Sequence, residues 1–405
     1  MTSHRARVVV AGASMAGLRT AEQLRAAGWT GAITLVGDEP HMPYNRPPLS
    51  KEVLAGRATF ESLAFRPRAS VADAQWRLGT KAVAARLDER IVALDDGSEI
   101  AYDALVVATG MRPRRLACPG PLVGRHTIRT VDDARGLRDE LTGPGVRLVV
   151  VGAGFIGCEV AATAVSLGVA EVTVVDPLPL PMVGPLGELL GRALLKRHQE
   201  HGVRFVLGTG VAGFEGEDRV TGVLLDDGTV LPADVVVESV GSLANTEWLD
   251  GNGLDLADGV LTDEQLRAGG RPDVVAVGDV ARFPNARYDG VPRRVEHWCI
   301  PTDTAKHAAK VLAARLTGEG PEPAPFAPLP SFWSDQHGFR LQSFGAPALG
   351  RGDVRVLDGD PAADVLVGYH HGGRLVGVVA LGGPATVSAA ARRRAELLRQ
   401  PALTA

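Results

Sequence analysis

A segment that occurs twice constrains the fold more than any other feature of the chain. Residues 7–17 read RVVVAGASMAG, and residues 147–157 read RLVVVGAGFIG. In each copy a run of β-branched residues reaches a glycine-rich turn and enters a stretch rich in Ala and Leu. This pattern is typical of a buried parallel strand that leads into a helix. The sequence therefore predicts two similar α/β units.

A second pair of segments follows the first at a similar distance. LDDGSEIAYDALVVATG at 94–110 aligns without a gap with LDDGTVLPADVVVESVG at 225–241. Asp-Asp-Gly between extended runs is typical of a hairpin turn, and the valine-rich run after it predicts a buried strand that ends in Gly. We also expect a strand over 32–36 that ends near Asp38 and Glu39, and one over 171–175 that ends in Asp176.

The glycine turns have the spacing of dinucleotide-binding loops. The second turn carries Gly152, Gly154 and Gly157, whereas the first has Gly12, Ser14 and Gly17. A small second residue lets the backbone approach a pyrophosphate, and the N–H groups at the helix start then face the phosphates. One such match is weak, because a βα turn without a ligand explains it equally well. Two copies in the same strand–turn–helix context favour two nucleotide sites.

Two dinucleotide sites indicate two dinucleotides, and transfer between a flavin and a nicotinamide is the chemistry that fits them. A late run, VVAVGD at 274–279, ends in Asp279. A carboxylate there could hydrogen-bond a ribityl chain, which NAD lacks. The ordinary alternative is an Asp that caps the next turn.

Composition and charge narrow the kinds of partner, cofactor and cellular location that the chain can have. The chain has 405 residues and a formal net charge of −4, so nucleic acid is not an expected partner. Three separated cysteines, Cys118, Cys158 and Cys299, form no paired motif, so we expect no metal or cluster site and a reducing, cytoplasmic location. The apolar stretches 8–18 and 148–170 fit buried strands running into helices, and no membrane partner is predicted.

Read in order, further motifs resemble one family, the FAD-dependent, NADH-linked ferredoxin reductases that serve bacterial P450s and ring-hydroxylating dioxygenases. The resemblance covers essentially the whole chain. PYNRPPLSK and FWSDQ distinguish this branch best from other flavoprotein reductases. The motifs are GASMAG (12–17), PYNRPPLSK (43–51), ATG (108–110), RT (129–130), GAGFIGCE (152–159), NTEWL (245–249), VGDVA (277–281), EHW (296–298) and SFWSDQ (331–336).

The resemblance implies an FAD site in the first unit. Arg46 and Lys51 would lie over the flavin, the backbone of Val83 would reach the adenine, and Trp298 would contact the isoalloxazine ring. Arg129 and Asp279 would bind the phosphate and ribityl parts. The implied FAD-binding residues are Gly12, Ser14, Ala16, Gly17, Asp38 or Glu39, Arg46, Lys51, Val83, Ala108, Thr109, Gly110, Arg129, Asp279 and Trp298.

The second unit would hold NADH. By resemblance, Lys51 and Glu159 form a catalytic pair beside the flavin N5. Independently, we predict that Glu159 lies on the first turn of its helix, where the dipole favours an anion; simple dipole stabilisation is the alternative reading. Asp176 would accept hydrogen bonds from the ribose and repel a 2′-phosphate, which predicts NADH over NADPH. The implied NAD-binding residues are Gly152, Gly154, Phe155, Ile156, Gly157, Glu159, Asp176 and Gly241.

A [2Fe–2S] ferredoxin is the implied acceptor, and such ferredoxins are acidic. A basic rim could steer them, and a solvated arginine-rich surface is the alternative. Only Asp289 and Glu296 oppose this rim locally. Its candidate residues are Arg282, Arg287, Arg293, Arg294 and Arg340.

The chain also departs from the family. CIPTDTAKH at 299–307 replaces the usual Asn-Ala and Gln-Gly, which puts the lining of the flavin face in question.

These expectations combine into an α/β architecture like that of glutathione reductase. It has two Rossmann-like dinucleotide-binding domains and a C-terminal α+β domain. We predict an FAD domain at 1–113 and 246–324, an NAD domain at 114–245, and a C-terminal domain at 325–405 with strands at 340–344, 365–369 and 375–381 and a closing helix. No cysteine pair lies in NRPPLSK at 45–51, so electrons must enter and leave through the flavin itself.

The predicted function is NADH-dependent ferredoxin reduction for a P450 or dioxygenase. The alternatives are an NADH oxidase or rubredoxin reductase on the same scaffold, or a low-turnover flavoprotein that senses NADH.

Overall fold

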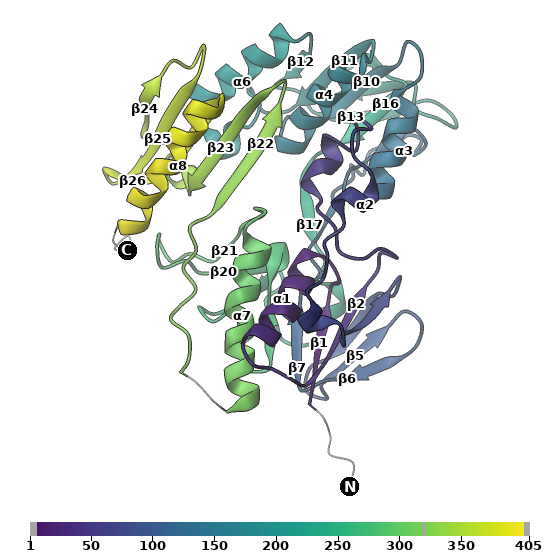
Figure 1. Ribbon diagram of the computed structural model, residues 1–405. Coiled ribbons are helices and arrows are strands. Elements are labelled where there is room, and N and C mark those ends of the chain that lie inside the picture. The colour runs from purple at the N-terminus through teal and green to yellow at the C-terminus, as the bar shows by residue number, and fades with distance from the viewer. Residues whose placement is uncertain (1–5, 319–320, 401–405) are drawn as a thin grey trace.

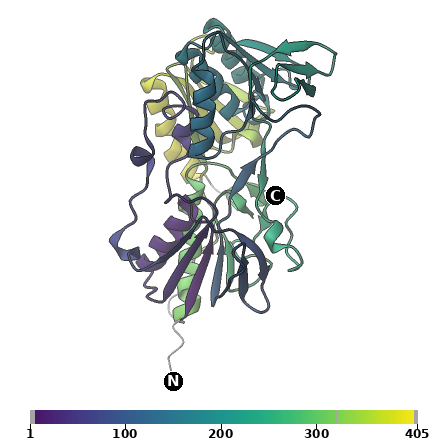
Figure 2. The same cartoon turned by 90° about the vertical axis from the view of Figure 1, so that its right-hand side faces the viewer.

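The structure is a computed structural model that describes residues 6–318 and 321–400. Figure 1 shows the first α/β unit below the second, with the C-terminal sheet beside the second unit. The view turned by 90° shows the same arrangement, with the first sheet at the bottom and the helices of the second unit above it (Figure 2). The two repeated segments therefore build separate parts of the molecule.

The first unit is a five-stranded, fully parallel sheet in the order β19-β7-β1-β2-β3. Its central strand is completely buried at Val8, Val9 and Val10, which explains the continuous run of β-branched residues. Helices α1 and α7 pack side by side against the sheet (Figure 1). The elements are β1 (Arg7–Ala11), α1 (Met15–Ala26), β2 (Ala32–Gly37), β3 (Gln75–Leu78), β7 (Ala104–Val107), β19 (Val274–Ala276) and α7 (Ile300–Thr317).

The second unit repeats this plan. Its parallel sheet has the order β12-β11-β10-β16-β9, and β10 pairs with β11 and β16 as β1 pairs with β2 and β7. The elements are β9 (Arg125–His126), α3 (Val131–Leu141), β10 (Arg147–Val151), α4 (Phe155–Leu167), β11 (Glu171–Asp176), α5 (Val183–Leu186), α6 (Glu188–Glu200), β12 (Arg204–Leu207) and β16 (Val235–Glu238).

Each unit also carries a three-stranded antiparallel sheet before its last repeated strand. Both Asp-Asp-Gly segments form the predicted hairpin turns, with Gly97 at φ 81° and Gly228 at φ 83°. Positive φ favours glycine, which explains the residue type at these turns. The strands are β4 (Ala82–Arg86), β5 (Ile91–Leu94) and β6 (Glu99–Ala101), and β13 (Val211–Glu215), β14 (Gly222–Leu225) and β15 (Val230–Pro232).

The chain crosses between the units at one antiparallel strand pair, β8 (Met111–Pro113) with β17 (Ser242–Ala244). This pair lies next to both predicted boundaries of the NAD domain, and the domain limits themselves stay a prediction. The other connecting elements are η1 (Pro47–Ser50), α2 (Phe60–Leu63), η2 (Ala69–Val71), η3 (Glu247–Leu249), β18 (Val260–Leu261), η4 (Gly278–Val280), β20 (Ala281–Phe283) and β21 (Arg293–Arg294).

The C-terminal part is a five-stranded antiparallel sheet, β22-β23-β26-β25-β24, that α8 covers on one face (Figure 1). The three predicted strands and the closing helix are present, but the prediction missed two edge strands. These are β22 and β24, which have few buried residues: Ser334 and Gln336 in β22, and none in β24. The elements are β22 (Ser331–Gln336), β23 (Phe339–Gly345), η5 (Pro347–Gly350), β24 (Val354–Gly359), β25 (Val365–His371), β26 (Arg374–Gly382) and α8 (Pro384–Arg399).

In the part of the chain that the structure describes, no helix combines the length and the hydropathy that crossing a bilayer requires. The two apolar stretches of the sequence are β1 with the start of α1, and β10 with α4.

Candidate functional site

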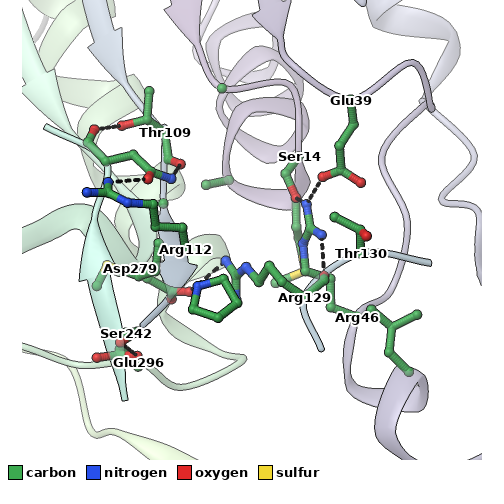
Figure 3. Close-up of a pocket in the computed structure, with 18 of the residues that line it drawn as sticks. Ser14, Glu39, Arg46, Thr109, Arg112, Arg129, Thr130, Ser242, Asp279 and Glu296 are labelled. Carbon is green, nitrogen blue, oxygen red and sulfur yellow. Dashed lines mark hydrogen bonds and ion pairs between the residues drawn. The ribbon is translucent and has the colours of Figure 1, made fainter. Parts of the chain in front are cut away.

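One cavity of about 1600 Å³ reaches from the first glycine turn to the second. Its lining includes Gly12–Ala16 of the first unit, Gly154–Ile156 of the second, and Phe332 and Trp333 of β22. Figure 3 shows part of this cavity, with Arg46 directed toward Glu39 and Ser14, and Arg129 directed toward Asp279. The cavity thus joins residues from all three parts of the chain.

The first glycine turn has no room for side chains at two positions. A Cβ on Gly12, where φ is +119°, would lie 2.0 Å from the carbonyl oxygen of Ala108. A Cβ on Gly17 would lie 2.0 Å from the carbonyl oxygen of Gly12. Helix α1 therefore starts close against the strand end, and the first N–H groups of a helix lack intrahelical acceptors. This end of the cavity suits a phosphate group.

The PYNRPPLSK segment closes over that turn through an ion-pair network. Arg46 pairs with Glu39 and donates hydrogen bonds to the Tyr44 hydroxyl at 3.0 Å and to the carbonyl oxygen of Arg129 at 2.7 Å. Although burial alone would lower it, the Glu39 carboxylate raises the pKa of Arg46. Both oxygens of Glu39 have partners, because the Tyr44 hydroxyl donates to the second one at 2.5 Å. Asp38, the alternative ribose ligand, is exposed at the cavity wall.

Arg129 and Asp279 face each other across the cavity, 3.6 Å apart (Figure 3). Burial lowers the pKa of Arg129 and raises the pKa of Asp279. Both shifts mean that the charged forms lack full solvation there. A ligand with phosphate and hydroxyl groups would supply the missing hydrogen bonds.

The ATG and NTEWL motifs interlock beside the cavity. The Thr109 hydroxyl donates to the carbonyl oxygen of Asn245 at 2.7 Å, and the Asn245 amide donates back to the carbonyl oxygen of Thr109 at 2.9 Å. Arg112 donates to the Asn245 side-chain oxygen at 2.9 Å (Figure 3). Elsewhere in the lining, the indole N–H of Trp298 donates to the side-chain oxygen of Asn45 at 2.9 Å. Trp298 is 41% exposed, so its ring stands at the mouth of the cavity.

The second glycine turn repeats the geometry of the first. A Cβ on Gly152 would lie 2.3 Å from the Ser239 carbonyl oxygen, and one on Gly157 would lie 2.0 Å from the Gly152 carbonyl oxygen. Asp176 braces this turn, since its carboxylate accepts from the N–H groups of Ala153 at 2.7 Å and Leu178 at 2.8 Å. The carboxylate is therefore fixed at the strand end, where the sequence predicts a ribose.

Glu159 and Lys51 form a nearly buried ion pair between the two units. The Lys51 Nζ lies 2.6 Å from Glu159 Oε2, with side chains 12% and 8% exposed. Ser50 donates to the same oxygen at 2.5 Å, and Ser334 donates to Oε1 at 2.6 Å. The predicted pairing is present, but the predicted place on the first helical turn is wrong. Helix α4 begins at Phe155 and has no acid in its first turn, so side-chain donors fix this carboxylate.

Most of the predicted site residues line this one cavity, including the exposed Val83 and Gly241. Gly17, Gly152, Gly157 and Asp176 do not line it. The three glycines allow the tight backbone approach within the turns without facing the cavity. Asp176 lies outside the cavity wall and accepts a hydrogen bond from the Ala153 N–H. Their roles toward a nucleotide stay predictions.

The atypical 299–307 segment forms the start of α7 and reaches the cavity through Pro301. The buried Thr304 hydroxyl accepts from the Gly278 N–H at 2.9 Å and donates to the Ile300 carbonyl oxygen at 2.6 Å. Thr304, one of the residues that differ from the family pattern, thus anchors the turn that carries Asp279.

The predicted arginine rim is not an uncompensated basic patch. Asp289 and Glu296 oppose it locally, as expected, and the fold adds Asp255 and Asp258 from distant segments. Arg287 instead donates to main-chain oxygens of α8. The ion pairs are Arg282 with Asp255, Arg293 with Asp289, Arg294 with Asp258 and Glu296, and Arg340 with Asp335.

The three cysteines are free thiols, as the sequence predicts. Burial raises the pKa of Cys158 and of Cys299, so neither thiol is an activated nucleophile.

Sequence reasoning assigned no role to several residues that build the site. Tyr44, Asn45, Ser50, Ser334 and Asn245 all stand inside quoted motifs. The motif was the available signal, but a contact such as Ser334 with Glu159, 175 residues apart, has no local pattern.

Comparisons with known proteins agree with this geometry. The sequence profile of the family described as pyridine nucleotide-disulphide oxidoreductase matches residues 6–300, and that of a reductase C-terminal domain matches residues 331–400. A probable ferredoxin reductase of Castellaniella defragrans is 39% identical over 384 residues, which are 93% of this chain and 91% of the relative.

Two further comparisons cover similar lengths. The ferredoxin reductase component of a chlorobenzene dioxygenase from a Cupriavidus species is 40% identical over 395 residues, or 95% of this chain and 91% of the relative. In the crystal structure of the covalent putidaredoxin reductase–putidaredoxin complex, the matching chain is 35% identical with a TM-score of 0.87. The match covers 96% of this chain and 93% of that one.

Proposed function

Because the chain belongs to the pyridine nucleotide-disulphide oxidoreductase family, in its ferredoxin reductase branch, we propose that it passes electrons from NADH to a [2Fe–2S] ferredoxin. That ferredoxin would supply a P450 or a dioxygenase, in line with the relative that serves chlorobenzene dioxygenase. FAD, when bound, supplies the chemistry that converts a two-electron donor into single-electron steps.

The residues along the cavity fit FAD. The tight first turn at Gly12 and Gly17 leaves the backbone accessible to a pyrophosphate, and the incompletely solvated Arg129–Asp279 pair suits phosphate and polyol groups. We assign FAD to the part of the cavity between this turn and Trp298. Arg46 acts indirectly, by holding the PYNRPPLSK segment and the Arg129 backbone together.

The Lys51–Glu159 pair is the observation that carries the proposal. It fixes one positive and one negative group, 2.6 Å apart and nearly excluded from water, between the two glycine turns. These groups can hydrogen-bond the amide of a nicotinamide, Lys51 to its oxygen and Glu159 to its nitrogen. The pair therefore orients the reacting ring, and its role is positioning and electrostatics.

Asp176 would select NADH. Its carboxylate is pinned by two backbone N–H groups and cannot swing away from a 2′-phosphate. Residues 177–191 contain no basic side chain that could compensate the phosphate.

We keep the domain division at 113/114 and 245/246, because the strand pair β8–β17 is the crossover between the two sheets. We also infer a cytoplasmic location, since three free thiols and a nicotinamide donor fit a reducing compartment.

The test is NADH-driven cytochrome c reduction with and without an added [2Fe–2S] ferredoxin, repeated with NADPH. We expect strong dependence on the ferredoxin and preference for NADH. NADH consumption without ferredoxin and with peroxide release would establish an oxidase instead. A flavin that bleaches with NADH but does not turn over would indicate a sensor.

A further inference from the structure

A chain of hydrogen bonds leads from Glu159 into the C-terminal domain. Ser334 Oγ donates to Glu159 Oε1 at 2.6 Å, and Gln336 Nε2 donates to Ser334 Oγ at 2.8 Å. Gln336 Oε1 lies 2.8 Å from His198 Nε2, and His198 Nδ1 lies 3.1 Å from His337 Nε2. The chain connects β22 and the β22–β23 turn with α4 and α6, which lie beside them in Figure 1.

The direction of every link follows from the first. A carboxylate only accepts, so Ser334 must donate to it and can accept from the Gln336 amide. The Gln336 oxygen then requires a donor, which sets the N–H of neutral His198 on Nε2 and leaves Nδ1 to accept from His337. All donors therefore point toward Glu159.

Water cannot replace any central link. Ser334 and His198 are fully buried, Gln336 is 2% exposed, and Glu159 is 6% exposed. A polar group left without its partner in such surroundings keeps the cost of its desolvation. Strand alternation explains the arrangement, because Ser334 and Gln336 share one face of β22, whereas Asp335 on the other face pairs with Arg340.

We propose that Ser334 and Gln336 are positioning residues for nicotinamide binding, which hold the Glu159 carboxylate in place through a hydrogen-bond chain that ends on His198. Lys51 and Ser50 both bind Oε2 of Glu159, and contacts to one oxygen do not fix how the carboxylate plane is turned. Ser334 alone among the contacts given for the described residues binds Oε1 and thereby fixes the plane of the carboxylate. The inference rests on the proposed function, in which Glu159 contacts the nicotinamide.

The structure offers a matched control on the adjacent strand. Ser343 is also fully buried, in β23, and its hydroxyl has no hydrogen-bond partner in the described structure. Ser334→Ala and Ser343→Ala remove the same atom from the same sheet, but only the first removes a donor to Glu159.

The experiment is calorimetric titration of FAD-loaded enzyme with NAD⁺, together with NADH kinetics using a ferredoxin acceptor. We expect Ser334→Ala to raise the Kd for NAD⁺ and the KM for NADH about tenfold with kcat little changed, and Ser343→Ala to stay within about twofold. Gln336→Leu acts through Ser334 and should raise both constants about threefold. This variant provides the test if Ser334→Ala fails to fold.

Action through Glu159 is tested by a double-mutant cycle. In a Glu159→Gln background, Ser334→Ala should add little to the Kd, because the carboxylate that it positions is gone. An equal increase in both backgrounds would overturn the inference. So would equal effects of Ser334→Ala and Ser343→Ala in an enzyme whose wild type binds NAD⁺ and reduces ferredoxin. A wild type that does neither would overturn the proposed function itself.

Discussion

The two glycine turns share one backbone and differ in what surrounds it. Gly12 and Gly152 have φ values of +119° and +104°, and a Cβ on either would collide with a carbonyl oxygen of the neighbouring strand end. Gly12 N–H donates to Val36 and Gly152 N–H to Val175, at 2.7 and 2.8 Å. The duplicated pattern thus specifies the same strand–turn–helix geometry twice.

The side chains at equivalent positions have separate tasks. At the strand end, the second unit has Asp176, which braces its turn, whereas the first has Gly37, where a Cβ would lie 2.5 Å from that of Ala13. In the helix, Glu159 faces the cavity, but its counterpart Arg19 pairs with the buried Glu22. The first turn is instead held from outside, by Arg46. One backbone therefore supports two different sites because the bracing residues differ.

The largest expected effect, on stability, comes from adding a side chain to the tight glycine of either turn. Gly12→Ala and Gly152→Ala should each destabilise the protein by about 3 kcal/mol or more, since a backbone carbonyl cannot yield to the new Cβ. We expect Gly12→Ala to purify without FAD, and Gly152→Ala to keep FAD but lose NAD⁺ binding. Absorbance of the purified proteins and titration with NAD⁺ measure both outcomes.

Gly154→Ala is the control for these substitutions. Its Cβ meets nothing within 4 Å and its φ is −79°, so we expect normal stability. NAD⁺ binding should still weaken, because a pyrophosphate would occupy that space. Equal loss of FAD from the two tight-turn variants would contradict the division of tasks between the units.

The next prediction compares substitutions of Glu159 and Arg19, which occupy equivalent positions in the two helices. Glu159→Gln keeps the shape but removes the charge beside Lys51, and we expect kcat/KM for NADH to fall about 100-fold through misplacement of the nicotinamide. Arg19→Ala removes a partner of buried Glu22 and should lower stability by about 1–3 kcal/mol without changing NADH kinetics. Steady-state kinetics and chemical unfolding of both variants test this, and a matching kinetic loss in Arg19→Ala would refute it.

Acid should destabilise the second unit through His198, which is fully buried in α6. Burial lowers the pKa of His198 to about 4, below the value of about 6.5 in an unfolded chain. The unfolded state therefore binds more protons, and the stabilisation is complete above pH 6.5 and lost as the pH falls toward 4. By linkage this one group costs about 2 kcal/mol of stability between pH 7.5 and pH 5.

His198→Gln isolates that contribution. Glutamine can still donate to Gln336 but does not titrate in this range. The difference in unfolding free energy between pH 7.5 and pH 5, measured with urea, should be about 2 kcal/mol smaller in the variant than in the wild type. Burial also lowers the pKa of His297 to about 4 and of His337 to about 3, so some acid sensitivity should remain. An unchanged difference would show that His198 does not carry the effect.

The sequence predicted what depends on local pattern and on motifs. The paired turns, the Asp-Asp-Gly hairpins and the fold class are confirmed. The Lys51–Glu159 contact is also confirmed, and it could be predicted because both residues stand in recognisable motifs. Long-range partners could not be predicted. Nothing near Ser334 indicates Glu159, and nothing near Arg282 indicates Asp255, because only the packed fold brings these segments together.

The smallest expected effect concerns the strand ends, where the two units differ most simply. Asp176→Ala removes the charge that would repel a 2′-phosphate, and we expect the preference for NADH over NADPH to fall about tenfold. It also removes the brace on Ala153, so binding of NADH itself should weaken, whereas FAD content should not change. The ratio of kcat/KM values for the two donors measures the selectivity separately from the loss of the brace. Asp176→Asn provides the matched comparison, because its amide oxygen can still accept from Ala153 while the charge is gone. If the ratio falls equally in both variants, repulsion sets the preference, and if it stays high in both, Asp176 is only a structural brace of the turn.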